Sequence, residues 1–362
     1  MNNQPEEKKA QAVPARKRRS CLNCLGRGAI ILAGLLVVTL AAGAIYQAAA
    51  SASALKKYPA TGKLYDIGEY SLHLRCTGEG NPTVVLEAGS GTPGLVWTPV
   101  QREIEKSMRV CSYDRAGYGY SESAAGPLPP QQVASDLHAL LKAANVPGPY
   151  IMVGHSAGGV YVRAYANQYP SEVVGMVLVD SSHEDENLIL PPEWVKLNQT
   201  QDSMIALCRA MSPFGLMRLS HMFDAAIAGV SMDAQVGAAY LASTYQTRFC
   251  RASAEEIEAL ASTPYQPDTP GRLGNMPLIV LTADTSQELL QAQVPGYLKS
   301  TVGPEVVAKV FQANREMQKS LAGLSSRGRQ IMVPNSGHMI QLEQPGVVID
   351  AIRTIVEQVR GG

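Results

Sequence analysis

The sequence is poor in charge. Only 17% of its 362 residues are Asp, Glu, Lys or Arg, and the formal net charge at pH 7 is zero. The charge is also uneven: seven basic and two acidic residues precede residue 28, so this segment carries +5 and the rest of the chain −5. A folded part of net negative charge lacks the basic surface that nucleic acids require. We therefore expect no nucleic-acid partner and assign residues 1–27 to a basic cytoplasmic tail.

Charge is missing altogether between Arg27 and Lys56, and most of this stretch is apolar. A helix over residues 28–50, rising about 1.5 Å per residue, would cross a hydrocarbon core of about 30 Å. The basic tail would keep the N-terminus in the cytoplasm and send the remainder across. We predict a single transmembrane anchor over 28–50, a linker over 51–62 and a folded domain on the extracytoplasmic side. A signal peptide cleaved at Ala52-Ser53-Ala54 is the alternative.

Cysteine is also scarce, with six residues in the chain. Cys76, Cys111, Cys208 and Cys250 fall on the predicted outer side of the membrane, where disulfides persist. All four could instead be small buried apolar side chains, which is a common use of cysteine.

No internal repeat is evident, and from residue 63 apolar runs of strand length alternate with helical patterns. The expected strands are Lys63–Ile67, Tyr70–Arg75, Thr83–Glu87, Arg109–Tyr113, Tyr150–Val153, Val173–Val179, Pro277–Leu281 and Gln330–Val333. The expected helices are Trp97–Lys106, Pro130–Ala144, Val160–Gln168, Pro304–Leu321 and Pro345–Val359. Such alternation predicts right-handed crossovers and a mainly parallel sheet. It stops over about 184–275, where short Met- and Leu-containing helical patterns predict an inserted helical lid.

One stretch combines a strand, a sharp turn and a helix. The apolar run Tyr150–Val153 leads into Gly154-His-Ser156-Ala-Gly158, and a helical pattern follows. A serine at such a turn has a strained backbone, and its glycine neighbours let strand and helix approach closely. The turn points the backbone N–H of Ala157 at the space in front of the serine hydroxyl, where it can stabilise an oxyanion. Ser156 is the candidate nucleophile.

These residues, and the order serine, acid, histidine along the chain, resemble the α/β-hydrolase superfamily from about Lys63 to the C-terminus. The turn Asp114-Arg115-Ala-Gly117-Tyr-Gly119-Tyr-Ser121 is similar to the family's segment after its fourth strand. The resemblance implies an eight-stranded, mainly parallel sheet flanked by helices in a domain spanning residues 63–362. Ala88-Gly89-Ser90-Gly91 occupies the position of the oxyanion loop, so Ser90 or Gly91 would supply a second N–H beside that of Ala157.

A serine hydroxyl needs an adjacent base, and His338 is the best candidate. It follows the last strand in the loop Ser336-Gly337-His338, which is similar to the family's histidine loop. The acid that orients the imidazole is expected after the seventh strand, where Asp284 lies. Some hydrolases place it after the sixth strand, which makes Asp180 the alternative.

The resemblance implies hydrolysis of an ester or related small acyl compound through an acyl-Ser156 intermediate, with no metal or organic cofactor. A serine at the elbow excludes the aspartate nucleophile of epoxide and haloalkane hydrolases. Two alternatives remain open: a small-peptide peptidase resembling proline iminopeptidases, and a ligand-binding homologue without turnover. The sequence leaves the substrate and the oligomeric state undefined.

The resemblance also suggests two disulfides. In the hydrolase sheet the second and fourth strands are antiparallel neighbours, so Cys76 and Cys111 would face each other at a distance that a disulfide tolerates. Cys208 and Cys250 both fall on predicted lid helices and would form a second bridge.

Overall fold

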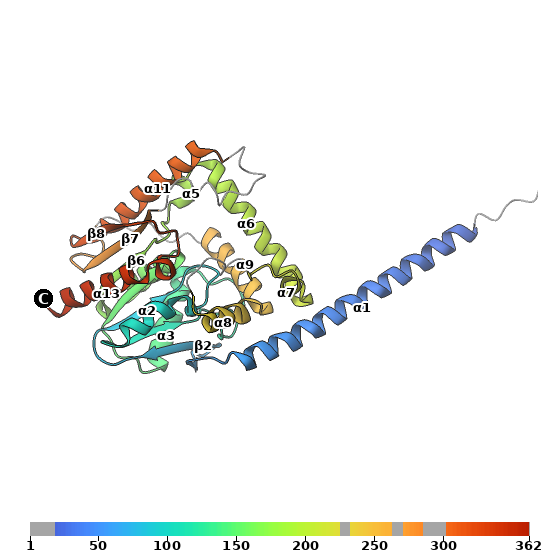
Figure 1. The fold of residues 1–362 in the computed structure, drawn as a ribbon, viewed down its shortest axis with the longest axis horizontal. Coiled ribbons are helices and arrows are strands. Elements are labelled where there is room, and N and C mark those ends of the chain that lie inside the picture. The colour runs from blue at the N-terminus through green and yellow to red at the C-terminus, as the bar shows by residue number, and fades with distance from the viewer. Residues whose placement is uncertain (1–18, 225–231, 263–270, 285–301, 362) are drawn as a thin grey trace, which may run out of the picture.

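The computed structural model describes residues 19–224, 232–262, 271–284 and 302–361. The first eighteen residues of the predicted tail, and parts of the predicted lid at 225–231 and 263–270, lie outside these ranges. Figure 1 shows a layered domain from which one long N-terminal helix projects.

The predicted eight-stranded sheet is confirmed, with the order β1-β2-β4-β3-β5-β6-β7-β8. Its strands are β1 (Lys63–Asp66), β2 (Ser71–Thr77), β3 (Thr83–Glu87), β4 (Val110–Tyr113), β5 (Tyr150–His155), β6 (Val173–Val179), β7 (Leu278–Asp284) and β8 (Gly328–Pro334). Only β2 runs antiparallel to its neighbours β1 and β4; the other pairs are parallel. The C-terminal ends of the parallel strands therefore meet at one edge, where sites form in open α/β sheets.

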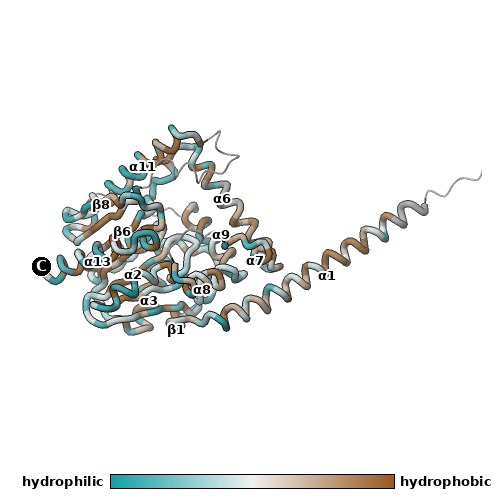
Figure 2. The backbone as a smooth tube through the Cα atoms, viewed as in Figure 1, coloured by the Kyte–Doolittle hydropathy of each residue, from teal (hydrophilic) through white to brown (hydrophobic). Residues whose placement is uncertain are grey.

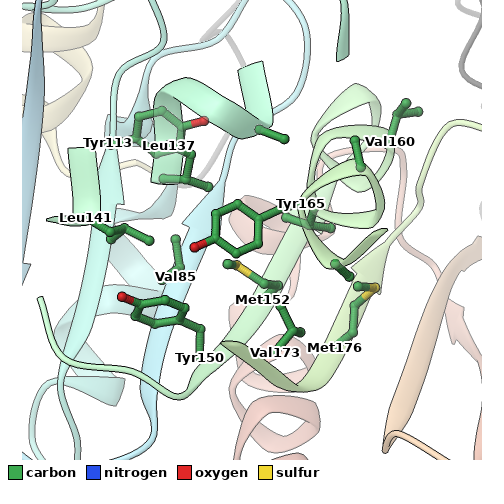
Figure 3. Close-up of a cluster of buried hydrophobic side chains, with 14 of the residues drawn as sticks. Val85, Tyr113, Leu137, Leu141, Tyr150, Met152, Val160, Tyr165, Val173 and Met176 are labelled. Atoms are coloured by element: carbon green, nitrogen blue, oxygen red, sulfur yellow. The ribbon is translucent and has the colours of Figure 1, made fainter. Parts of the chain in front are cut away.

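The central strands are nearly continuous apolar runs because both faces of the sheet are covered. Successive residues of β5 alternate between two buried clusters: Met152 packs on one face, Ile151 and Val153 on the other. On the first face lie α3 (Pro130–Ala143), α4 (Ala157–Gln168) and α11 (Pro304–Ala322). Figure 3 shows Tyr150, Met152 and Tyr165 packed together in this cluster. The other face carries η1 (Gly94–Trp97), α2 (Thr98–Ile104), α12 (Ile340–Glu343) and α13 (Pro345–Arg360).

The predicted lid is a set of helices between β6 and β7. It comprises α5 (Glu186–Ile189), α6 (Pro192–Met211), η3 (Ser212–Phe214), α7 (Leu216–Leu219), α8 (Ala234–Thr244) and α9 (Thr247–Ser262). Its buried centre includes Tyr245, Phe249 and Tyr118, the last from the turn after β4. The lid is thus packed against the turn that follows β4.

Both predicted cysteine pairs lie at disulfide distance. Cys76 and Cys111 are directly opposite each other in the β2–β4 register, with sulfur atoms 2.01 Å apart. Cys208 on α6 and Cys250 on α9 have sulfur atoms 1.96 Å apart and join two lid helices.

The N-terminal helix α1 (Arg19–Lys57) is longer than the predicted anchor. Residues 25–57 are long and apolar enough to cross a membrane by length and composition, a test that a signal sequence also passes. Figure 2 shows the hydrophobic stretch along its projecting part. Residues 51–57, expected to belong to a linker, continue the helix.

Candidate active site

Ser156 lies between the end of β5 and the start of α4, as the sequence predicts. Its backbone has φ 53° and ψ −126°, a strained conformation for a residue other than glycine. The backbone is held on both sides. Its N–H donates to the carbonyl of Val179 at 3.2 Å, and its carbonyl accepts from the N–H groups of Gly159 at 2.9 Å and Ser182 at 3.0 Å. These bonds fix the turn that raises the hydroxyl above the sheet edge.

The glycines around Ser156 are required by close backbone approach. A Cβ on Gly154 would lie 2.5 Å from the carbonyl oxygen of Gly158. A Cβ on Gly158 would lie 2.6 Å from the carbonyl oxygen of Glu87 at the end of β3. Any larger residue would push α4 away from the strand end, and the turn at Ser156 would open.

His338 lies in the loop after β8, as predicted. Its Nδ1 is 2.7 Å from Oδ2 of Asp180, and its side chain is 54% exposed. His155, directly before Ser156, donates from Nε2 to the carbonyl of His338 at 2.9 Å, and the two rings lie 4.6 Å apart. His155 thus anchors the loop that carries His338. No hydrogen bond among the described residues joins Ser156 Oγ to His338, as is common in hydrolases without bound substrate.

The structure does not bring the first choice of acid, Asp284, against His338. Strand β7 continues through Asp284, which is paired with Pro334 of β8, instead of ending at Leu281. The Asp284 carboxylate accepts from the Arg315 guanidinium on α11 at 2.6 Å, and among the described residues it makes no hydrogen bond to His338. Asp180, the alternative, is the residue placed against His338.

Asp180 reaches His338 because the chain turns sharply after β6. The residue has φ 41°, and its Oδ1 accepts from the N–H of Ala283 at 3.0 Å, near the end of β7. Its carboxylate therefore lies across the strand end where the acid was expected. The available sequence signal was an acidic residue, Asp180, placed directly after the long apolar run Val173–Val179.

The charges of this pair favour an ionised acid and a basic imidazole. Burial would raise the pKa of Asp180, but hydrogen bonds from His338, Ala283 and Asn314 outweigh it, so the pKa lies below its usual range. The partial burial of His338 would lower its pKa, but the hydrogen bond and charge of Asp180 raise it above its ordinary value. By contrast, burial lowers the pKa of His155 to about 3, so this imidazole stays neutral.

A second charged group, unforeseen from the sequence, holds the loop of residues 88–91. Arg115 is buried and donates to the carbonyls of Ala88 at 2.6 Å and Gly89 at 2.8 Å. The same guanidinium binds Glu87 at 2.7 Å and Glu256 at 2.9 Å. Its sequence signal was present in the Asp114–Ser121 turn, but its partners were not evident.

Glu256, on lid helix α9, reaches the same loop directly. One of its oxygens accepts from the Ser90 hydroxyl at 2.6 Å and from the Gly91 N–H at 3.2 Å. Tyr118 and Tyr161 also donate to this carboxylate, at 2.7 Å and 2.9 Å. Burial would raise the pKa of Glu256, but Arg115 and these donors lower it, so the carboxylate is held ionised.

This arrangement separates the two oxyanion-loop candidates. The N–H of Gly91 is taken by Glu256, whereas the N–H groups of Ser90 and Ala157 have no hydrogen-bond acceptor among the described residues. Gly89 lies against the nucleophile: an added Cβ there would be 3.0 Å from Cβ of Ser156 and 2.7 Å from Nδ1 of His155. Within the described ranges, no group of three His, Cys, Asp or Glu residues is arranged to bind a metal.

The model of the alpha/beta hydrolase family matches residues 84–351, which contain all of these groups. The chain belongs to the alpha/beta hydrolase family. Family membership supports a hydrolase acting on a small molecule.

Individual relatives are distant. The chain is 26% identical over 292 residues to the uncharacterized protein YqjL of Bacillus subtilis strain 168, covering 80% of this chain and 90% of that one. It is 27% identical over 311 residues to the probable transporter efuK of Hormonema carpetanum, covering 82% of this chain but only 42% of that longer protein. The fold is similar to that of a thermophilic esterase from Thermogutta terrifontis, with TM-score 0.55 and 20% identity, over 83% of this chain and 99% of the esterase.

Proposed function

We propose that this protein is a serine hydrolase that cleaves an ester or related acyl compound through an acyl-Ser156 intermediate. The observation that carries the proposal is the strained turn at Ser156 beside a histidine whose Nδ1 lies 2.7 Å from an ionised carboxylate. Membership of the alpha/beta hydrolase family and a fold shared with an esterase support it.

In the proposed reaction the Ser156 hydroxyl attacks the acyl carbonyl, and Nε2 of His338 takes its proton. Asp180 fixes the tautomer by accepting from Nδ1–H and stabilises the imidazolium that forms. The C–O bond to the leaving group then breaks, and the alcohol departs with the proton from His338. A water molecule, deprotonated by the same imidazole, hydrolyses the acyl-enzyme and returns the hydroxyl to Ser156.

The oxyanion of the tetrahedral intermediate would be bound by the N–H groups of Ala157 and Ser90. The first lies at the N-terminus of α4, where the helix dipole favours negative charge. The second belongs to the loop that Arg115 and Glu256 hold in place. Gly91, the other candidate, already donates to Glu256.

A fluorophosphonate probe tests the nucleophile, and Ser156→Ala is the matched variant. We expect the parent chain to be labelled at Ser156 and the variant to be unlabelled. The variant should lose on the order of 10⁶ in kcat on acyl esters, and its circular dichroism spectrum should match that of the parent. Turnover by the variant within tenfold of the parent would refute the role of Ser156.

A substrate panel separates the alternatives. Acyl esters of increasing chain length are compared with aminoacyl amides at equal concentration. Ester turnover without amide turnover is the expected result, and the reverse would identify a peptidase. A chain that neither reacts with the probe nor turns over any substrate would instead be a ligand-binding homologue.

A further inference from the structure

The lid carries an exposed apolar surface. Among the described residues, every exposed large apolar side chain outside α1, except Leu64, lies between residues 188 and 222. These side chains are Leu188, Ile189, Met204, Leu207, Leu216, Leu219 and Met222. Single exposed apolar residues are ordinary, but Leu216, Leu219 and Met222 lie close together on and just after α7, and such clustering is typical of an interaction surface.

Helix α1 packs against this same stretch, beside α7 (Figure 1). A Cβ on Gly43 would lie 2.6 Å from the carbonyl oxygen of Phe214. A Cβ on Gly215 would lie 2.8 Å from the ring of Tyr46. Two glycines therefore allow close contact between the long helix and the segment that leads into α7.

Gln47 is a polar residue of α1 that is buried in this contact. Its side chain is only 4% exposed, and its amide nitrogen donates to the carbonyl of Tyr245 at 2.8 Å. A polar side chain within a membrane span is costly unless the protein supplies its partners. Here the lid supplies the partner and covers the amide.

The position of these contacts along α1 determines how deeply α7 would lie in a membrane that α1 crosses. The uncharged stretch covers residues 28–55, and a hydrocarbon core of about 30 Å takes about 20 helical residues. Every window of that length within 28–55 includes Gly43, Tyr46 and Gln47. Wherever a membrane sits on α1, these residues lie inside its apolar layer or at its edge, and the lid segment that contacts them lies at the same level.

We propose that the lid surface formed by Leu216, Leu219 and Met222 is embedded in the lipid of the membrane that α1 spans. The partner is the bilayer itself, reached by the lid beside the helix. Arg218, between two of these residues, is compatible with this depth. Its guanidinium bonds the Tyr245 carbonyl at 3.1 Å, and its long aliphatic stem can lie along apolar surface.

Depth-dependent fluorescence quenching tests this proposal independently of activity. The full chain with Leu219→Trp is reconstituted in phosphatidylcholine vesicles whose acyl chains are brominated near the headgroup. Glu357→Trp on α13 is the matched control, because Glu357 is exposed and α13 ends on the side of the domain away from α7 (Figure 1). The emission added by each new tryptophan is obtained by subtracting the parent spectrum.

We expect the Leu219→Trp emission to be blue-shifted and quenched at least about twofold more than that of Glu357→Trp, as for side chains at the headgroup–acyl boundary. Met222→Trp should behave alike and replaces Leu219→Trp if that variant misfolds. Equal quenching in lid and control would overturn the proposal. So would a chain that fails to float with the vesicles, or a Leu219→Trp signal shielded from both bromolipid and aqueous iodide, which would mean that protein covers the surface.

Discussion

Two charged groups flank Ser156, and they are built in opposite ways. On one side, His338 is half exposed and bound to a single carboxylate, that of Asp180. On the other side, Arg115 is buried and shared by Glu87 and Glu256, and its guanidinium lies over the rings of Tyr118 and Tyr161. The first group can gain and lose a proton within reach of solvent. In the second group the pKa of Arg115 is raised and that of Glu256 is lowered, so these two side chains stay charged, whereas burial raises the pKa of Glu87 to about 7.

The difference indicates that the groups around His338 and Arg115 have different tasks. A group that moves protons needs an accessible imidazole, whereas a loop that must offer an N–H at one point in space needs rigid anchors. Fixed charge in a buried network supplies such anchors because the alternative, an unpaired buried charge, is costly.

The largest effect is expected at the acid. Asp180→Asn keeps the size of the side chain but removes the charge that orients His338, and kcat should fall by about 10⁴. Asp284→Asn is the matched control. It removes only the exposed ion pair with Arg315, so kcat should stay within a few-fold of the parent, as for surface ion pairs. A severe Asp284→Asn and a mild Asp180→Asn would reverse the assignment.

An intermediate effect is expected at Glu256. Glu256→Gln removes the charge that holds Ser90 and Gly91, while Glu87 still neutralises Arg115. A loop displaced by about 1 Å would lower kcat by up to about 10²-fold with little change in KM. Glu255→Gln changes the adjacent residue, whose one ion pair among the described residues is with Arg251 on α9, and it should leave kcat unchanged. A change in KM alone would assign Glu256 to substrate binding instead.

The smallest effect is a shift of the pH profile. The imidazole must be neutral to accept the serine proton, so kcat/KM should be full above the pKa of His338 and fall as pH drops through it. Because Asp180 raises this pKa, the acidic limb of the residual activity in Asp180→Asn should move to lower pH. Glu256→Gln should leave the acidic limb of the pH profile where it is in the parent, because the charge of Glu256 acts on Arg115 and the loop of residues 88–91. A limb that moves in Glu256→Gln and not in Asp180→Asn would contradict the division of tasks.

The fold was predictable because its strands are apolar runs closed by glycine, proline or polar residues. Thr83–Glu87 and Val173–Val179 coincide with β3 and β6. Ser156 was predictable because close approach of strand and helix demands the glycines at 154 and 158.

Other features depend on tertiary structure that no local pattern encodes. The position of the acid depends on whether β7 stops at Leu281 or pairs with β8 through Asp284, and on the left-handed turn at Asp180. The role of Glu256 requires a lid helix to meet a loop 165 residues away in the chain. The contact between α1 and the lid likewise joins segments that have no sequence relation.

The bridge between Cys76 and Cys111 also acts on the chain before it folds. It closes a loop between residues 35 positions apart. Such a loop removes entropy from the unfolded ensemble worth about 4 kcal/mol at 25 °C in the chain-entropy model. Typical domains are stable by only about 5–15 kcal/mol. The redox state of the cysteine pair that joins β2 and β4 therefore governs a large share of the margin between the folded and unfolded protein.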